Sequence, residues 1–237
     1  MKKPFLQAEW NNLIMVNYVI DPALLLPYLP AHTELDVYKG NVYVSVIGFM
    51  FEEVKLLGFK IPFHVNFEEV NLRFYVRHFH NSQWKRGAVF IKEIVPKYAI
   101  TFVANNLYRE KYSCMPMKHS LVKNEDSLSI SYGWKYKNKW NTMEATVGVN
   151  TVPMEEDSEE QFIAEHYWGY SKYNNSTTFE YEVLHPSWQV YPVKDYALDC
   201  DFEKLYGKSF AFLADQKPSS VFVAKGSEIS IMNKRRL

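Results

Sequence analysis

Cysteine is nearly absent from this sequence. Only Cys114 and Cys200 occur among 237 residues, too few for a disulfide framework or a four-thiolate metal site. These two cysteines could form a single disulfide, but two buried free thiols in a reducing compartment are the commoner arrangement. No run approaches the roughly 20 apolar residues of a membrane span, and the start MKKPFLQAEW has no apolar segment typical of a secretory signal. We therefore expect a cytoplasmic protein that does not associate with membranes.

Net charge and the common site signatures are also missing. The 27 Lys and Arg residues balance the 27 Asp and Glu residues. Phosphate-dominated binding needs a basic surface, so nucleic acid is not an expected partner. The sequence contains no G-x-G-x-x-G, Walker A, H-E-x-x-H, G-x-S-x-G or C-x-x-C motif. These absences argue against nucleotide-dependent enzymes and zinc proteases, and we expect no cofactor.

Aromatic residues, in contrast, are abundant. They make up 16% of the chain, and hydrophobic residues as a whole make up 47%. Aromatic and β-branched side chains suit half-buried strands, and alternating segments recur along the chain without a βαβ rhythm. One helix is predicted over 97–108 from the spacing of its apolar residues, and another from the capping-box sequence Ser158-Glu159-Glu160-Gln161 to about Tyr167. Strands are predicted over 112–122 and, near the end of the chain, around Val221 and around Ile229. The pattern predicts one α+β domain over residues 1–237, mostly antiparallel β with a few short peripheral helices.

The segment FEEVNLRFYV, residues 67–76, poses the main question about function. One alternating set, Val70, Leu72, Phe74 and Val76, forms a core face. The other set, Glu69, Asn71, Arg73 and Tyr75, can either face water or line a ligand pocket. On a straight strand Glu69 and Arg73 would lie about 13 Å apart, so each would be free to meet a ligand or a neighbouring strand. Alternation alone leaves both interpretations open, because small barrels commonly point one set inward.

Other polar residues have plainer explanations. His78 and His80 share one face of a strand, but no third ligand is marked, and we expect no metal site. Glu165 lies in the C-terminal half of the predicted helix, where the helix dipole disfavours a carboxylate, so a partner such as Arg73 is a reasonable hypothesis. His185 precedes a proline and is either a strand-end histidine or a pocket residue.

Several segments resemble the YqjF-like family, also known as DUF2071. The resemblance rests on AEWNNLIMVNYVIDPALLLPYLP with the following DVYKG, on FEEVNLRFYV with RGAVFIKEI, and on FIAEHYWGY and LHPSWQV. It implies a fold similar to acetoacetate decarboxylase, a largely antiparallel closed barrel around an internal cavity. It also implies that the Glu69, Asn71 and Arg73 row faces into this cavity. The candidate ligand-binding residues are Glu69, Asn71, Arg73, Tyr75, Tyr112, Glu165, His185 and Trp188.

The resemblance also bears on chemistry. Acetoacetate decarboxylase uses a lysine that forms a Schiff base, and its counterpart here falls in LYREKYSCM. The register that fits best places Tyr112 and Ser113 at the two lysines of the decarboxylase. Lys111 is adjacent, but on a strand it would point to the opposite face. Lys92 is another nearby amine, with nothing to favour it.

Two classes of function fit these residues. The first is a protein that binds a small carbonyl or carboxylate molecule in a barrel cavity without a Schiff-base lysine. The second is a lyase- or hydrolase-like enzyme that uses Glu69, Arg73 and Tyr112 in acid–base chemistry, with Glu69 and Tyr112 as the candidate catalytic groups. A small molecule is the expected partner in both, and the sequence does not indicate an oligomeric state.

Overall fold

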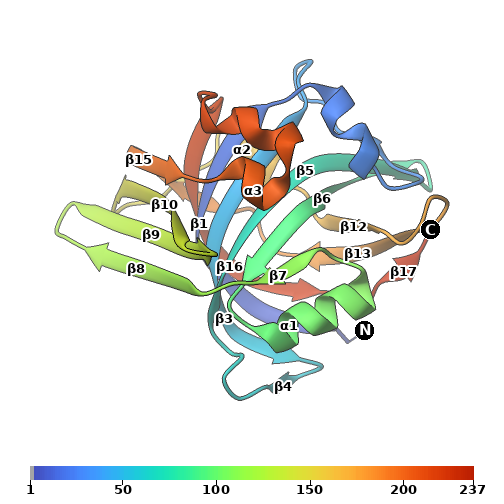
Figure 1. The fold of residues 1–237 in the computed structure, drawn as a ribbon, viewed down its shortest axis with the longest axis horizontal. Coiled ribbons are helices and arrows are strands. Elements are labelled where there is room, and N and C mark those ends of the chain that lie inside the picture. The colour runs from blue at the N-terminus through green and yellow to red at the C-terminus, as the bar shows by residue number, and fades with distance from the viewer. Residues whose placement is uncertain (1–2) are drawn as a thin grey trace.

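The computed structural model describes residues 3–237, which form two β-sheets with short helices on their faces (Figure 1). The larger sheet has 13 strands among the described residues, in the order β11-β14-β16-β1-β3-β5-β6-β12-β13-β17, with β2, β4 and β7 attached to its side. Its main strands are β1 (Leu6–Val19), β3 (Tyr43–Leu56), β5 (Phe67–His80), β6 (Gln83–Val95), β12 (Trp168–Lys172), β13 (Thr178–Leu184) and β16 (Ser220–Ile231). Its short strands are β2 (Glu34–Leu35), β4 (Phe59–Lys60), β7 (Tyr112–Cys114), β11 (Val152–Pro153), β14 (Gln189–Tyr191) and β17 (Arg235–Arg236).

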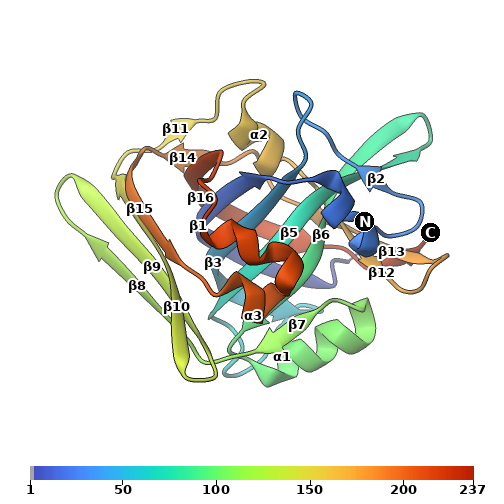
Figure 2. The ribbon, with the colours of Figure 1, turned by 45° about the horizontal axis from the view of Figure 1, so that its top comes forward.

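The smaller sheet and the helices lie around the larger sheet. The smaller sheet has the order β15-β10-β9-β8, and its β8–β9 hairpin projects to one side in both views (Figure 2). Its strands are β8 (Met117–Lys123), β9 (Ser127–Tyr136), β10 (Lys139–Gly148) and β15 (Val193–Asp199). The α-helices are α1 (Tyr98–Val103), which continues as a π turn (Ala104–Tyr108), α2 (Glu159–Ala164) and α3 (Phe202–Tyr206). Short 3₁₀ helices are η1 (Pro22–Leu24), η2 (Leu26–Tyr28) and η4 (Lys208–Ala214). The prediction of a mostly antiparallel β protein with few helices is confirmed.

Strand β5 is buried on both faces. Leu72 and Phe74 belong to a core that includes Phe202 and Phe210 from the α3–η4 segment. On the opposite face, Tyr75 packs in a second core with residues of β1, β3 and α2. The strand therefore has no solvated face along most of its length, and the polar set of residues 69–75 lies inside the protein.

Helix α2 starts as the sequence predicts but ends earlier. The Ser158 hydroxyl caps it by accepting a hydrogen bond from the amide of Gln161 at 3.1 Å, and the Gln161 side chain returns to the amide of Asp157 at 2.9 Å. The helix stops at Ala164, because the chain turns at Glu165 to enter β12, which starts at Trp168. The prediction of a helix reaching Tyr167, with Glu165 inside it, is wrong.

Two strand predictions also need correction. The predicted strand at 112–122 is divided into β7 and β8 around Pro116, because proline cannot donate to a ladder. The two strands expected near Val221 and Ile229 are one strand, β16, that passes through Gly226 at a φ of 88°. An added Cβ at Gly226 would lie 1.8 Å from the Trp10 carbonyl oxygen, so only glycine fits there. Both cysteines are free, but Cys114 is exposed rather than buried as predicted.

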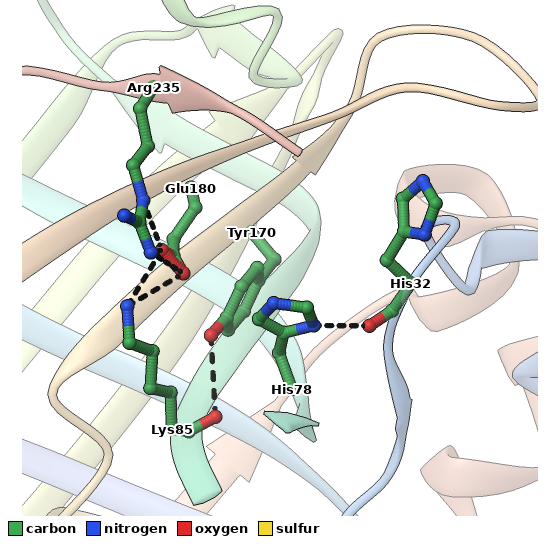
Figure 3. A network of polar contacts seen from close by, with 6 residues as sticks. All are labelled: His32, His78, Lys85, Tyr170, Glu180 and Arg235. Atoms are coloured by element: carbon green, nitrogen blue, oxygen red, sulfur yellow. Dashed lines mark hydrogen bonds and ion pairs between the residues drawn. The ribbon is translucent and has the colours of Figure 1, made fainter. Parts of the chain in front are cut away.

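A buried carboxylate ties the C-terminal strand to the large sheet. Glu180 of β13 is fully buried and accepts hydrogen bonds from Lys85 Nζ at 3.1 Å and from Arg235 Nε at 2.7 Å (Figure 3). The Tyr170 hydroxyl donates to the Lys85 carbonyl oxygen at 3.3 Å. The ion pairs thus join β13 to β17, with which it also pairs through the backbone, and to β6, which lies on the other side of β12 in the sheet. Over residues 3–237, none of the helices has the length and apolar composition needed to cross a membrane.

Candidate functional site

A cavity of about 60 Å³ lies beside the polar face of β5. Its walls combine apolar and aromatic side chains with polar groups from β5, β6, β7 and the α2–β12 connection. The polar and aromatic residues that line it are Trp10, Phe49, Phe51, Glu69, Asn71, Arg73, Phe90, Glu93, Tyr112, His166, Trp168, Tyr181, His185 and Trp188.

Glu69 is the centre of a buried hydrogen-bond network. One carboxyl oxygen accepts from Asn71 Nδ2 at 2.9 Å, and the other accepts from the Tyr112 hydroxyl at 2.9 Å. These contacts follow from strand register, since Asn71 pairs with Glu93 across β5–β6 and Glu93 pairs with Tyr112 across β6–β7. Burial raises the pKa of Glu69 to about 7, against the opposing effects of Asn71, Tyr112 and Arg73.

Two further buried carboxyl groups lie near Glu69. Burial, together with the charges of Glu110 and Glu69, raises the pKa of Glu93 well above its usual value. Glu110 accepts a hydrogen bond from the Tyr181 hydroxyl at 2.8 Å, and burial raises its pKa to about 8. Three carboxyl groups in one poorly solvated region cannot all ionise at low cost, so this region favours protonated carboxyls near neutral pH.

The position of Tyr181 depends on a glycine. Tyr181 of β13 pairs with Gly169 of β12, and its ring lies across that residue. A Cβ added at Gly169 would lie 2.1 Å from Cζ of Tyr181, well inside contact distance. The absence of a side chain at position 169 therefore allows the Tyr181 hydroxyl to reach Glu110.

His166, which the sequence interpretation did not select, also lines the cavity. It lies between α2 and β12, its side chain is fully buried, and its Nε2 is 3.1 Å from Asp36 Oδ2. Asp36 also accepts from Arg86 Nε at 2.7 Å. Burial alone would raise the pKa of Asp36, but the hydrogen bonds and charges of His166 and Arg86 hold it below its usual value. Burial lowers the pKa of His166 to about 4, so the imidazole is neutral at pH 7.

Arg73 is the cationic group of the cavity. Its Nε donates to the Tyr75 hydroxyl at 3.3 Å and its Nη2 donates to the Ile163 carbonyl oxygen at 3.4 Å, both long bonds. Over residues 3–237 it forms no ion pair with Glu165, and the predicted pairing of these two residues is wrong. Glu165 instead accepts from the Ser187 hydroxyl at 2.7 Å, because the early end of α2 turns it toward that loop.

The structure separates the eight predicted site residues into two groups. Six of them line the cavity, namely Glu69, Asn71, Arg73, Tyr112, His185 and Trp188. Tyr75 and Glu165 do not line it. Tyr75 is fully buried behind Arg73 and donates to the Ser45 hydroxyl at 2.8 Å, which makes it a support for the site.

His185 and Trp188 line the cavity side by side. Their rings stack with centroids 4.2 Å apart, and Trp188 Nε1 donates to the Ser227 hydroxyl at 2.9 Å. His185 and Trp168 each line both the cavity and a surface groove of about 970 Å³. The side chains of His185 and Trp168 therefore lie at the boundary between the groove and the cavity. Burial, and to a smaller extent Arg73, lowers the pKa of His185.

The nearby amines lie outside the cavity. Lys111 is exposed, with its ammonium group 5.0 Å from the centre of the Tyr28 ring. Lys92 donates to the Leu205 carbonyl oxygen on the α3 side of the sheet. His78 stacks on His80. The Nδ1 atom of His78 lies 2.6 Å from the His32 carbonyl oxygen (Figure 3). Within residues 3–237, no group of three or more His, Cys, Asp or Glu side chains is placed to hold a metal ion.

Glu93 shows why sequence reasoning missed part of the site. Strict alternation along β6 would place residues 88, 90 and 92 on one face. The β5–β6 register instead shifts between Leu72 and Arg73, so that Ala88, Phe90 and Glu93 line the cavity and Lys92 points away. A carboxylate within the apolar run VFIKEIV was the available signal. Asp36 and His166 carried no local signal, because tertiary packing alone brings them together across 130 residues.

Comparison with known proteins identifies the family and the fold of the chain. The chain matches DUF2071, a family described as an uncharacterized conserved protein, over residues 7–228. It is 27% identical over 187 residues to the uncharacterized protein YqjF of Bacillus subtilis (strain 168). This alignment covers 77% of this chain and 74% of YqjF.

Solved structures with the same fold include an acetoacetate decarboxylase from Legionella pneumophila, with a TM-score of 0.64, 14% identity, and coverage of 100% of this chain and 88% of that one. An acetoacetate decarboxylase-like enzyme from Sphingomonas wittichii RW1 gives a TM-score of 0.66 at 12% identity, covering 100% and 94%. The enduracididine biosynthesis enzyme MppR, in complex with pyruvate, gives 0.65 at 12% identity, covering 100% and 91%. At these identities the likeness concerns the fold. The chain therefore belongs to the DUF2071 family and has an acetoacetate decarboxylase-like fold.

Proposed function

We propose that this protein binds a small organic carboxylate in the cavity beside β5, with Arg73 as the anion-binding group. The main observation behind this proposal is that several buried polar atoms of residues lining the cavity lack hydrogen-bond partners elsewhere in the described structure. Within residues 3–237, three buried atoms of the lining have no hydrogen-bond partner, namely Asn71 Oδ1, Glu93 Oε2 and His166 Nδ1. Leaving such atoms unpaired costs about 1–3 kcal/mol each. All three residues line the cavity, so a polar ligand bound there would lower this cost.

The size and charge of the cavity define the ligand further. On the measure by which one water molecule needs about 10–15 Å³, the cavity has about 60 Å³, which limits an enclosed ligand to a few non-hydrogen atoms. Arg73 keeps donors free for a carboxylate, because its two protein contacts are long and single. The neighbour MppR was solved with pyruvate, a keto acid of this size, and pyruvate is therefore a suitable first probe.

We infer that the large sheet closes around this cavity. Strands β16, β1, β3, β5, β6, β12 and β13 pair in succession, and β13 pairs again with β16 through Val183 with Ile231 and Leu184 with Ser230. This succession returns to its first strand, which is the connectivity of a closed barrel. Closure would shield the Arg73–carboxylate contact from water and strengthen it.

The test is binding of pyruvate to the wild-type protein and to the Arg73→Ala variant. We expect Arg73→Ala to weaken binding on the order of 10- to 100-fold, as is typical for a hydrogen bond to a charged group. Because the guanidinium forms only long contacts with the protein, we expect little loss of stability. Isothermal titration calorimetry would measure the affinity and thermal unfolding the stability.

Arg77→Ala is the matched control. Arg77 lies on the same strand, but its Nε is bound to Glu34 at 2.7 Å, outside the cavity. Equal affinities of the two variants, or the absence of binding by the wild-type protein to any small carboxylate, would contradict the proposed function.

Acid–base catalysis in the same cavity is a second candidate function. The observation that favours it is the pKa of about 7 for Glu69, which lets this carboxyl both take and return a proton near neutral pH. With a bound keto acid, Glu69 would take a proton from the carbon next to the carbonyl. The C–H electron pair would form the C=C bond of an enolate, and Arg73 would stabilise the negative oxygen.

Exchange of the pyruvate methyl protons for deuterium in D₂O measures this step. We expect the wild-type protein to accelerate exchange and Glu69→Gln to lower the rate about 100-fold or more, since an amide cannot accept the proton. Tyr112→Phe removes a hydrogen bond to Glu69 and retains the carboxyl, so it should reduce the rate less. Wild-type exchange no faster than in buffer would eliminate the catalytic candidate and leave the binding proposal intact.

A further inference from the structure

His166 stands apart from the other polar groups of the cavity because its two nitrogens have different surroundings. Nε2 faces the Asp36 carboxylate at 3.1 Å, while Nδ1 is buried and has no partner in the part of the chain that the structure describes. The imidazole is held between the rings of Tyr75 and Phe162, with centroids 4.6 Å and 5.1 Å away. Its orientation is therefore fixed by packing as well as by the bond to Asp36.

The partner of Nε2 determines which nitrogen carries the proton. Asp36 is an acceptor, since it also receives the Arg86 Nε–H at 2.7 Å. A neutral imidazole facing an ionised carboxylate places its hydrogen on the nitrogen nearest to it, here Nε2. Nδ1 is then a lone pair, and it can only accept a hydrogen bond.

A second acceptor lies in the same cavity. Asn71 Nδ2 donates a hydrogen bond to Glu69 at 2.9 Å, and Asn71 Oδ1 remains a buried acceptor with no partner among the described residues. Asn71 and His166 are each more than nine-tenths buried, and both line the cavity. The cavity thus combines the cationic donor Arg73 with two buried acceptors, Asn71 Oδ1 and His166 Nδ1, beside the Glu93 carboxyl group.

We propose that His166, oriented by Asp36, is a ligand-binding residue that accepts a hydrogen bond from a ligand hydroxyl, so that the cavity prefers a small 2-hydroxy carboxylate to the corresponding 2-keto acid. This inference rests on the proposed function, because Arg73 must hold the carboxylate. The carbonyl oxygen of a keto acid would face the Nδ1 lone pair without a hydrogen between them, whereas a hydroxyl supplies that hydrogen. The enol form of a keto acid carries the same hydroxyl, so the preference is also compatible with the proton transfer considered for Glu69.

Two variants of His166 separate its two nitrogens. In His166→Gln the side-chain amide can reach the position of Nε2 and keep a bond to Asp36, but nothing replaces Nδ1. In His166→Asn the shorter amide can present its oxygen near the position of Nδ1, but the bond to Asp36 is lost. The probes are pyruvate and each enantiomer of lactate, with affinities measured by calorimetry.

We expect the wild-type protein to bind one lactate enantiomer on the order of tenfold more tightly than pyruvate. Pyruvate would leave the buried His166 Nδ1 unpaired, and a site discriminates against a ligand that leaves a polar group unpaired. His166→Gln should lose that preference by weakening lactate about tenfold while changing pyruvate little. His166→Asn should retain most of the lactate affinity. In the wild-type protein, the ¹⁵N chemical shifts of His166 should report a neutral imidazole with hydrogen on Nε2, and lactate should shift the Nδ1 signal.

The outcomes distinguish this inference from the function on which it rests. If neither acid binds, or binding is independent of Arg73, the proposed function fails. If pyruvate binds through Arg73 but lactate binds no more tightly and His166→Gln changes neither affinity, only the role of His166 is overturned. The ¹⁵N measurement needs no variant, so a failure of either substitution to fold leaves a decisive result: hydrogen on Nδ1, or no shift with saturating lactate, would overturn the role.

Discussion

Replacing Glu180 by Gln is expected to lower the free energy of unfolding by about 3–5 kcal/mol, the usual consequence of removing one partner from a buried ion pair. Glu180 is fully buried, and the Lys85 side chain beside it is only 17% exposed. Without the carboxylate, the Lys85 ammonium would remain in a poorly solvated site with no opposite charge. Urea unfolding would measure the effect as a shift of the transition midpoint at constant slope.

Arg235→Gln provides the comparison for this prediction. The Arg235 side chain is 47% exposed, so its charge is partly solvated and its loss leaves Glu180 paired with Lys85. We expect this substitution to lower the free energy of unfolding by about 1 kcal/mol, near the upper end of the range for exposed ion pairs. Equal costs for the two substitutions would show that Glu180 acts through β17 docking alone rather than through the buried charge of Lys85.

This network also marks the limit of local sequence reasoning. The alternation of β5 correctly predicts one face of Val70, Leu72 and Phe74 in the core, because period-two patterns follow directly from strand geometry. Nothing local to Glu180 distinguishes it from a solvent-facing glutamate. Its burial arises from β17, more than 50 residues later, and from Lys85, 95 residues earlier.

The candidate site divides in the same way. Glu69, Asn71 and Arg73 were accessible to prediction because they occupy one strand and keep its alternation. Glu93 could not be predicted to face the cavity, because a register shift exchanges the two faces of β6 at this point. His166 could not be placed either, because α2 ends at Ala164 instead of continuing to Tyr167 as predicted. Patterns within a single element were therefore predictable, whereas irregularities of the ladder and contacts between distant segments were not.

The buried carboxyl groups predict an unusual dependence of stability on pH. The pKa of Glu69 is about 7 and that of Glu110 is about 8 in the folded protein, both raised by burial above the usual value of 4.5. The folded state therefore binds these protons more tightly than the unfolded state does. A contribution of this sign is complete below about pH 4.5 and is lost as the pH rises through about 7 to 8.

His166 acts in the opposite direction at lower pH. Burial lowers its pKa from 6.5 to about 4, so its contribution is complete above about pH 6.5 and is lost as the pH falls toward 4. The two effects together place the maximum of stability on the acidic side of neutrality. From there to about pH 8, we expect the free energy of unfolding to fall by about 3 kcal/mol from Glu69 alone, since one pKa unit corresponds to about 1.4 kcal/mol.

Glu69→Gln isolates this contribution. The amide cannot ionise, so the variant should lose less stability than the wild-type protein between about pH 5 and pH 8, whatever its stability at one pH. Glu125→Gln, at an exposed position, is the control for adding an amide, and its profile should parallel the wild-type curve. Urea unfolding across this pH range would give both profiles. A Glu69→Gln curve parallel to the wild type would mean that Glu69 is ionised in the folded state throughout, and Arg73 would then have to be its effective counter-ion rather than a group free to bind a carboxylate.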